Sequence, residues 1–216
     1  MALEGNYTMK RRKREQIWNI LKGVLDLTQA RRVLVVPCAE SGKKSIWFLP
    51  EIHALGIQVV GADLSPSMLH KEWGWLVSEV PLVVCDIRSL PFREGTFDLV
   101  INQRFICHFD EEFRRKALSE MRRVTSGFLF IHYESKHTFK YLSRRLRERL
   151  GLRKRPPRTF HGGDFDWKST KHPLGHVKLS HKETKKELTD AGFQMVKVKP
   201  LFPLLSDRWC YLVKKV

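Results

Sequence analysis

The sequence lacks any hydrophobic run long enough to cross a membrane, and it has little cysteine. A helix that spans a bilayer needs about 18 or more consecutive apolar residues, and no stretch of the 216 residues approaches that length. The first residues are basic but show no separate apolar segment with a small-residue cleavage site, so no secretory signal is expected. The 4 cysteines stand far apart without a CxxC pair, which argues against a disulfide framework or a cysteine metal site. We therefore expect a cytoplasmic protein.

Acidic residues are scarce relative to basic ones. The chain has 40 Lys and Arg residues against 23 Asp and Glu residues, a net charge of +17 at pH 7. The positive charge is concentrated at residues 10–14 and 144–158. Such clusters attract anionic partners, which include phosphorylated small molecules, an anionic membrane surface and RNA. Charge alone does not choose among these partners, and a solvated face that keeps the protein soluble is the simpler alternative.

Apolar runs that end in polar residues recur along the chain. They predict strands at 32–37, 57–62, 82–85, 97–102, 127–133, 193–198 and 208–213. Near-continuous apolar strands are typical of a parallel sheet that is buried on both faces. Helical spacing or capping signals predict helices at 13–26, 43–55, 111–124 and 181–191, and one that begins near Ser65. The chain is therefore interpreted as one α/β domain over residues 1–216.

Two stretches resemble blocks of a known family. Residues 60–69 (VGADLSPSML) resemble the second block, and residues 81–110 the fourth and fifth blocks, of Rossmann-like S-adenosylmethionine-dependent methyltransferases of class I. The C-terminal helix, Ala-Gly-Phe and strand pair are similar to the family's closing β-hairpin. The resemblance implies a doubly wound, mostly parallel seven-stranded sheet with a C-terminal antiparallel hairpin. It also implies S-adenosylmethionine as the cofactor and methyl transfer as the reaction.

The resemblance assigns roles to polar residues at the strand ends. Asp63 would accept hydrogen bonds from the ribose hydroxyls, or would merely cap the next helix. Asp86 would accept from the adenine amino group beside the amide of Ile87, or would stabilise its own loop. The cofactor-binding candidates are Pro37, Cys38, Ala39, Glu40, Gly42, Asp63, Leu64, Met68, Asp86, Ile87, Asn102 and Gln103.

The family's glycine-rich first block is altered in this chain. Val35 stands where the family has an acid, and Pro37 and Ala39 stand where it has glycines. Proline removes a backbone donor, and alanine adds a methyl group where the cofactor lies close. Glu40 is a candidate replacement for the missing acid, and a loop that has lost cofactor binding is the alternative.

Polar residues near the same edge are candidates for the acceptor side of the reaction. His108, His132 and Tyr133 are candidates for a base or for orienting the acceptor. Arg104 is a substrate-binding candidate because a guanidinium is a rigid fork of donors for phosphate or carboxylate. A surface ion pair between Arg104 and Asp110 is the alternative.

A basic segment interrupts the family pattern at residues 135–179. Its apolar positions, Phe139, Leu142, Leu146 and Leu150, give one face to a basic helix, so we expect a lid or substrate-recognition insertion. Residues 1–30 are expected to form an N-terminal helical cap. The predicted function is methyl transfer to a small anionic or lipid-linked acceptor, in the cytoplasm or at the inner face of a membrane. An RNA methyltransferase and a non-catalytic methyltransferase-like scaffold are the alternatives.

Overall fold

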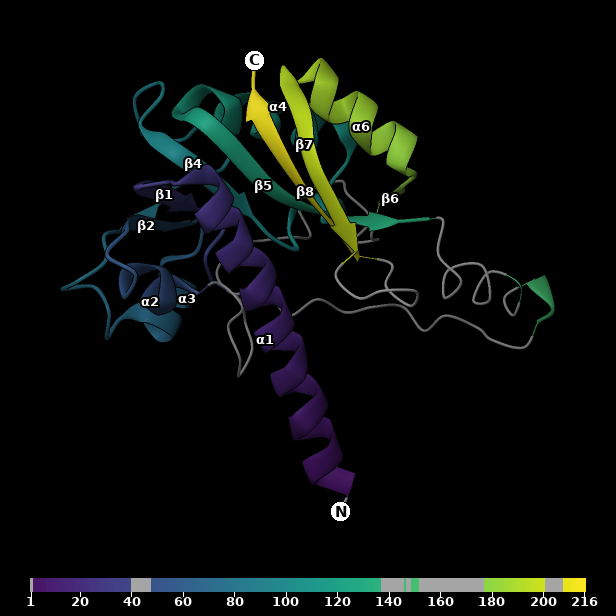
Figure 1. Cartoon of the computed structure of the whole chain (residues 1–216), viewed down its shortest axis with the longest axis horizontal. Coiled ribbons are helices and arrows are strands. Elements are labelled where there is room, and N and C mark those ends of the chain that lie inside the picture. Colours follow the sequence, from purple (N-terminus) through teal and green to yellow (C-terminus); the bar gives the residue numbers. More distant parts are fainter. Residues whose placement is uncertain (1, 40–47, 137–145, 147–148, 152–176, 201–207) are drawn as a thin grey trace.

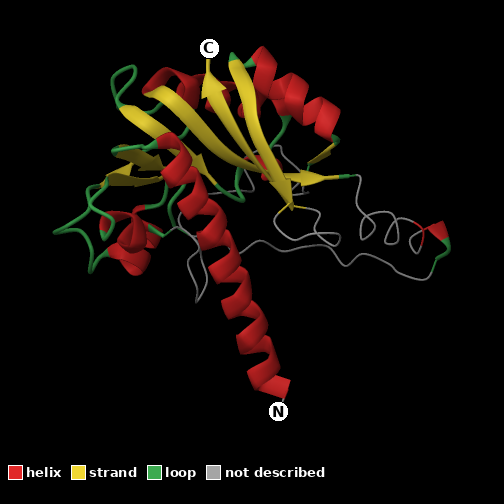
Figure 2. Cartoon of the chain, in the orientation of Figure 1, coloured by secondary structure: helices red, strands yellow, loops and turns green. Residues whose placement is uncertain are grey.

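The chain forms one twisted sheet with helices on both faces (Figures 1 and 2). The computed structural model describes residues 2–39, 48–136, 146, 149–151, 177–200 and 208–216. Within these ranges the sheet has 8 strands, in the order β3-β2-β1-β4-β5-β8-β7, with the short β6 also paired to β5. Their bounds are β1 Arg32–Val35, β2 Gln58–Asp63, β3 Leu82–Val84, β4 Phe97–Asn102, β5 Thr125–Ser135, β6 Lys178–Leu179, β7 Phe193–Pro200 and β8 Arg208–Lys215.

The strand directions confirm the predicted class of fold. Strands β1 to β5 pair in parallel, and β8 pairs antiparallel with both β5 and β7. This is the predicted doubly wound sheet with a C-terminal antiparallel hairpin. The additional strand β6 has only 2 residues and pairs with Glu134 and Ser135 at the end of β5. It was not predicted because two residues carry no detectable periodicity.

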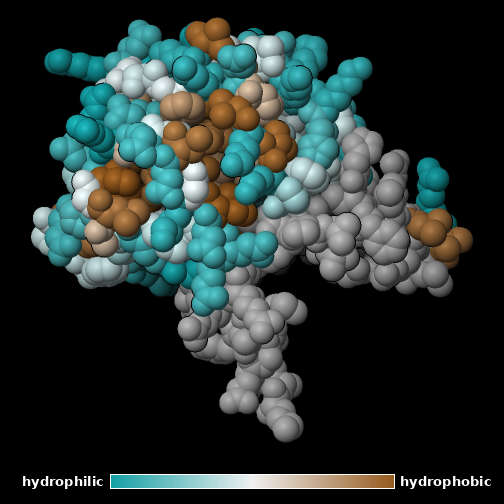
Figure 3. Space-filling model, in the orientation of Figure 1, coloured by the Kyte–Doolittle hydropathy of each residue, from teal (hydrophilic) through white to brown (hydrophobic). Residues whose placement is uncertain are grey.

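The helices divide between the two faces of the sheet. They are α1 Ala2–Thr28, α2 Leu49–His53, α3 Pro66–Trp73, the 3-10 turn η1 Ile106–His108, α4 Glu111–Val124 and α6 His181–Asp190. Helices α1, α2 and α3 pack against one face through Leu21, Ile52 and Leu69. Helices α4 and α6 pack against the other through Leu118 and Leu188. Hydrophobic side chains also show at the surface beside α1, which therefore covers only part of its face (Figure 3).

The helix starts follow the capping signals in the sequence. The Ser65 hydroxyl accepts from the amide of Met68 at 3.3 Å, so Ser65 caps α3. Asp110 caps α4 in the same way. The predicted capping box of α6 is present, with Ser180 and Glu183 bonding each other's backbone amides. These bonds satisfy amides that the first turn of a helix leaves without partners.

Several predicted boundaries and environments need correction. Strand β3 lies at the edge of the sheet, so Val84 is 55% exposed and the strand is not buried on both faces. Helix α1 begins at Ala2 rather than near Lys13. Pro50 sits in the first turn of α2, where its missing N–H costs nothing. The earlier part of the helix predicted at 43–55 lies outside the described residues.

Most of the predicted basic insertion also lies outside the described residues. Of its predicted apolar positions, Leu146 and Leu150 are described, and they are 58% and 62% exposed. The insertion leaves β5 at Lys136 and returns through Val177 into β6. No helix in the described part of the chain is both long and apolar enough to cross a membrane.

Candidate active site

The carboxyl ends of β1, β2, β3 and β4 meet at one edge of the sheet because these strands are parallel. From the central pair β1 and β4 the strand order proceeds outward in opposite directions. Open α/β sheets bind ligands at such a switch point, beyond the carboxyl ends of the strands. The candidate residues at 37–39, 63–64, 86–87 and 102–104 all end these strands or follow their ends. The structure therefore brings them to one edge.

Asp63, the last residue of β2, joins two loops at this edge. One carboxylate oxygen accepts from the amide of Ala39 at 3.0 Å, and the other accepts from the amide of Ser65 at 3.1 Å. Burial raises the pKa of Asp63, and hydrogen bonds from backbone amides partly oppose that increase. Besides the amides of Ser65 and Ala39, those of Leu64 and Cys38 also lower the pKa of this carboxylate. Asp63 does not cap α3 through its side chain, since Ser65 does that.

The altered loop after β1 bonds to the protein itself. The amide of Cys38 donates to the Ala62 carbonyl at 2.9 Å, and the Cys38 carbonyl accepts from the indole of Trp73 at 2.7 Å. With the amide of Ala39 on Asp63, the described backbone amides of this loop after Pro37 are already engaged.

Burial gives the side chains around this loop structural roles. Burial raises the pKa of the Cys38 thiol well above its usual range, which keeps the sulfur protonated. Val35, in the position of the family's acid, is fully buried in the core. Glu40 and Gly42 lie outside the described residues.

Asp86, after β3, is engaged by its neighbour Arg88. The guanidinium of Arg88 donates to both carboxylate oxygens of Asp86, at 2.6 to 3.1 Å, and the amide of Arg88 donates to one of them at 2.8 Å. Although partial burial opposes it, the bonds from Arg88 hold the pKa of Asp86 below its usual value. The same guanidinium lies 4.9 Å from the ring centre of Phe113. The side chains of Arg88 and Asp86 are 41% and 28% exposed, so this pair is accessible to solvent.

Asn102 and Gln103, at the end of β4, present buried polar atoms that the described protein leaves unused. The amide nitrogen of Asn102 donates to the Val36 carbonyl at 2.8 Å, which fixes the orientation of the side chain. Its carbonyl oxygen and the amide nitrogen of Gln103 have no hydrogen-bond partner among the described residues. Both residues are at least 95% buried. A buried polar atom without a partner costs about 1–3 kcal/mol, so these two atoms are an unsatisfied acceptor and an unsatisfied donor among the described residues at this edge.

The apolar candidates differ in exposure. Leu64 is 37% exposed at the end of β2, while Ile87 is 5% exposed after β3. Met68 is partly buried against the core on the α3 side of the sheet. Leu64 and Ile87 thus place apolar groups beside Asp63 and Asp86, whereas Met68 packs as part of its helix.

Arg104 and His132 are joined at the turn after β4. Arg104 has a φ of 53°, a left-handed conformation that is uncommon outside glycine. Its amide donates to Nδ1 of His132 at 3.1 Å. An amide N–H only donates, so Nδ1 is the acceptor of this hydrogen bond. This arrangement removes Nδ1 of His132 as a free base.

The other two catalytic candidates, His108 and Tyr133, differ in exposure. His108 lies in η1 and is partly exposed. Tyr133 is 1% exposed, and its hydroxyl donates to Glu187 of α6 at 2.9 Å. Burial, followed by the charge of Glu187, raises the pKa of Tyr133 well above its usual range. This placement favours a positioning role for Tyr133 over the predicted role as base.

Sequence reasoning missed four residues that hydrogen-bond to the candidate residues or to their loops. Arg88, Trp73, Arg114 and Glu187 each bond a candidate residue or its loop. Arg88 has a local signal, since it follows Asp86 by two positions in a turn. Arg114 and Glu187 are 73 residues apart, and no local pattern links them.

Comparison with known proteins agrees with this arrangement. Residues 40–131 match the family model described as a methyltransferase domain. Over this stretch the chain is similar to methyltransferase domains. This match confirms the predicted resemblance over residues 40–131. It starts at Glu40, so β1 and the altered positions Val35, Pro37 and Ala39 lie outside the matched region.

The fold of the domain is shared with solved structures. The PH0226 protein from Pyrococcus horikoshii OT3 is 20% identical with a TM-score of 0.67, covering 94% of this chain and 91% of that one. Magnesium protoporphyrin IX methyltransferase from Synechocystis PCC 6803, solved with bound SAH, is 14% identical with a TM-score of 0.66, covering 94% and 83%. The 1,6-didemethyltoxoflavin-N1-methyltransferase from Burkholderia thailandensis is 14% identical with a TM-score of 0.61, covering 99% and 87%.

One curated relative is similar in sequence. An uncharacterized protein of Haemophilus influenzae is 28% identical over 127 residues, which cover 56% of this chain and 48% of that protein. The chain thus spans about half the length of the curated relative that it matches.

Proposed function

We propose that this protein transfers the methyl group of S-adenosylmethionine to a small anionic acceptor. The observation that carries the proposal is the unused polar pair at the end of β4. Within the described part of the chain, the carbonyl oxygen of the Asn102 side chain and the amide nitrogen of the Gln103 side chain have no hydrogen-bond partner, and both lie at the switch point of the sheet. An amino-acid group, which has an ammonium donor and a carboxylate acceptor, matches this pair. The methionine portion of the cofactor is such a group.

The remaining edge residues then fall in order along the cofactor. Asp63 accepts from the ribose hydroxyls, beside its bonds from the amides of Ala39 and Ser65. Asp86 and the amide of Ile87 face the adenine edge, and Leu64 offers an exposed apolar surface for the ring. In this assignment Asn102 and Gln103 take the part that an acid plays in the family's first block, since Val35 is buried.

When bound, S-adenosylmethionine would supply a methyl group activated by a positively charged sulfur, with a neutral thioether as the leaving group. The chain's own task is to align the acceptor with that methyl group and to exclude water. Asp63 and the Asn102–Gln103 pair fix one side of this alignment. We assign the turn of residues 104–109, which directly follows Asn102 and Gln103 along the chain, to the acceptor side.

His108 is our candidate base for an acceptor that carries a proton. It is the partly exposed catalytic candidate on the acceptor-side turn. His132 instead orients Arg104 through Nδ1, and Tyr133 is buried against Glu187. A base is needed only where the attacking atom must lose its proton.

Charge and comparison support a small anionic acceptor. The net charge of +17 favours an anionic molecule, and Arg104 follows the Asn102–Gln103 pair at the edge. Two structural neighbours are named for small-molecule acceptors, magnesium protoporphyrin IX and 1,6-didemethyltoxoflavin. We extend only that class of acceptor to this chain. A lipid-linked acceptor at an anionic membrane surface is the variant that the basic segments would suit.

A methyltransferase-like protein without catalysis is the second candidate. It is favoured by the internal hydrogen bonds of Cys38, Ala39 and Asp86, which occupy groups that the cofactor would otherwise meet. This candidate and the proposal differ in one measurable respect, which is binding of the cofactor by the free protein.

Calorimetric titration with S-adenosylhomocysteine tests the proposal. Asp63→Asn preserves the size of the side chain but removes its charge, and loss of charge-assisted hydrogen bonds worth about 1.5–3 kcal/mol each should weaken binding at least tenfold. Asp98→Asn is a matched control, because Asp98 also accepts from two backbone amides, those of Arg31 and Arg32, but at the opposite edge of the sheet. Absence of binding by the folded wild-type protein, or equal weakening by both variants, would refute the proposed site.

A further inference from the structure

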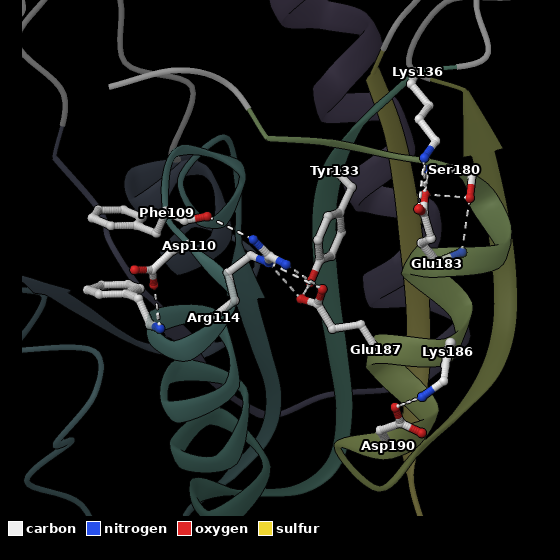
Figure 4. Close-up of polar contacts among 11 residues, drawn as sticks. Phe109, Asp110, Arg114, Tyr133, Lys136, Ser180, Glu183, Lys186, Glu187 and Asp190 are labelled. Carbon is white, nitrogen blue, oxygen red and sulfur yellow. Dashed lines mark hydrogen bonds and ion pairs between the residues drawn. The ribbon is translucent and has the colours of Figure 1, made fainter. Parts of the chain in front are cut away.

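A buried polar network lies beneath the turn that joins β4 to α4 (Figure 4). Arg114 of α4 donates through Nε and Nη2 to the two carboxylate oxygens of Glu187 of α6, each at 2.9 Å. The hydroxyl of Tyr133 of β5 donates to the same carboxylate at 2.9 Å. The side chains of Arg114 and Glu187 are only 5% and 17% exposed. Three elements that are distant in sequence thus converge on one carboxylate.

The remaining end of Arg114 points toward the active-site turn. Its Nη1 donates to the carbonyl oxygen of Phe109 at 2.8 Å. Phe109 directly follows η1, which carries His108, and precedes Asp110, the N-cap of α4. The network therefore ends on the backbone of the acceptor-side turn rather than on another side chain.

Two further contacts hold the same turn. The amide of Arg104, at its start, donates to Nδ1 of His132. The carbonyl of Cys107, in its middle, accepts from the amide of Val177 at 2.7 Å, where the chain returns from the basic insertion. Together with the contact to Phe109, these fix the beginning, middle and end of the segment 104–109.

Helix α6 links this support to the end of β5. Glu183, one turn before Glu187, accepts from the side chain of Lys136 at 2.8 Å while it completes the capping box with Ser180 (Figure 4). Lys136 is the residue at which the chain leaves β5 for the insertion. One helix therefore holds both the insertion's point of departure and, through Arg114, the acceptor-side turn.

The buried ion pair between Arg114 and Glu187 is not expected to contribute much to the stability of the fold. Removing two charges from water offsets most of their mutual attraction, so apolar residues of similar volume would stabilise the fold as well or better. An Arg–Glu pair also fixes the orientation of its groups, because the guanidinium is planar and its donors have fixed positions. Here Glu187, which is also bonded by Tyr133, orients the guanidinium of Arg114, and Arg114 then donates to the carbonyl of Phe109.

We propose that Arg114, Glu187 and Tyr133 are positioning residues that hold the turn 104–109 as the wall facing the methyl acceptor. The inference rests on the proposed function for the chemistry at this edge. In this role the network keeps the backbone of His108 at a fixed distance from the Asn102–Gln103 pair. Alignment of donor and acceptor to within a fraction of an ångström is where such support acts on the rate.

The same helix contains a matched control. Arg123 of α4 pairs with Glu120 at 2.7 Å and donates to the carbonyls of Phe92 and Leu90, which lie in the loop between β3 and β4. This is again an arginine that is oriented by a glutamate and used on loop carbonyls. The loop that it holds precedes β4 and lies outside the segment 104–109.

Hydrogen–deuterium exchange of the full chain, with and without S-adenosylhomocysteine, tests the proposal. In Glu187→Gln we expect amides within 104–110 to exchange about tenfold faster, as local opening becomes easier. We expect a smaller increase in Tyr133→Phe, which removes one hydrogen bond and is the safer variant if Glu187→Gln does not fold. Ligand-induced protection of the turn should be lost in Glu187→Gln, and the Kd for S-adenosylhomocysteine should rise severalfold. Glu120→Gln should instead speed exchange at 90–96 and leave the turn and the Kd unchanged.

Two results would overturn the proposal. The first is wild-type exchange at 104–110 and a wild-type Kd in both Glu187→Gln and Tyr133→Phe, which would reduce the network to a brace between helices. The second is an equal effect of Glu120→Gln on the turn. If the wild-type protein binds no S-adenosylhomocysteine, the proposed function itself fails, and the role of the turn as an acceptor wall fails with it, whatever the exchange pattern.

Discussion

Arg88 is expected to compete with the cofactor for Asp86. In the structure its guanidinium occupies both carboxylate oxygens of Asp86 and lies over the ring of Phe113. An adenine amino group that bonds Asp86 must displace or share that interaction. Replacing Arg88 by glutamine, which is shorter and uncharged, should therefore tighten the binding of S-adenosylhomocysteine.

The size of the effect follows from the exposure of the groups. An ion pair at side-chain exposures of 41% and 28% contributes at most about 1 kcal/mol in solution. An exposed contact between a guanidinium and an aromatic ring adds about 0.5–1 kcal/mol. Relief of about 1–2 kcal/mol corresponds to binding that is about 5 to 30 times tighter.

The assay is calorimetric titration of Arg88→Gln beside a matched variant. Arg32→Gln is the control, since Arg32 and Asp98 form a pair at exposures of 48% and 31% at the opposite edge of the sheet. The gain should also appear with adenosine alone, and it should shrink at high salt, which screens the exposed pair in the wild type. Weaker or unchanged binding by Arg88→Gln would refute the competition. An equal gain in Arg32→Gln would refute its location.

The pH dependence of binding and that of stability should have opposite signs. The folded state raises the pKa of Asp63 above its ordinary 3.8. The free energy of unfolding should therefore fall as the pH rises through the pKa that Asp63 has in the folded protein, because the folded state must then release the proton that it binds more tightly. Affinity for S-adenosylhomocysteine should rise over the same range, because the ionised carboxylate is the hydrogen-bond acceptor. Thermal melts and titrations between about pH 4 and 7 check this, and Asp63→Asn should abolish both trends. Ser180→Ala should lower stability by about 1 kcal/mol, or about 2–4 °C in Tm, through loss of the capping box. An unchanged melting temperature would contradict the role of Ser180 as the cap of α6.

Local sequence signals predicted the elements that are held by short-range physics. The apolar runs of β1 and β4 are central and buried, as their composition indicates, and Asp63 follows from its place at the end of β2. The caps at Ser65 and Ser180 depend on residues within the first turn, so they are legible in sequence. The same reasoning misjudged β3, because nothing in three apolar residues says whether another strand lies beyond them.

The contact between Arg114 and Glu187 could not be predicted from the sequence, because it depends on distant elements. Arg114 meets Glu187 across 73 positions, and only the folded sheet brings α4 and α6 side by side. Tyr133 was interpreted as a catalytic candidate because it ends a strand at the active edge, yet the alternation of side chains along β5 directs it toward α6, whereas His132 bonds the turn after β4. The placement of α6 on one face of the sheet therefore determines that Tyr133 bonds Glu187.

A crystal structure of the complex with S-adenosylhomocysteine tests the central claim most directly. We predict that the ribose hydroxyls donate to the carboxylate of Asp63. The amino-acid end of the ligand should bond to the side-chain oxygen of Asn102 and the side-chain nitrogen of Gln103. A ligand bound elsewhere, or one whose amino-acid end leaves both of these atoms without partners, would contradict this claim.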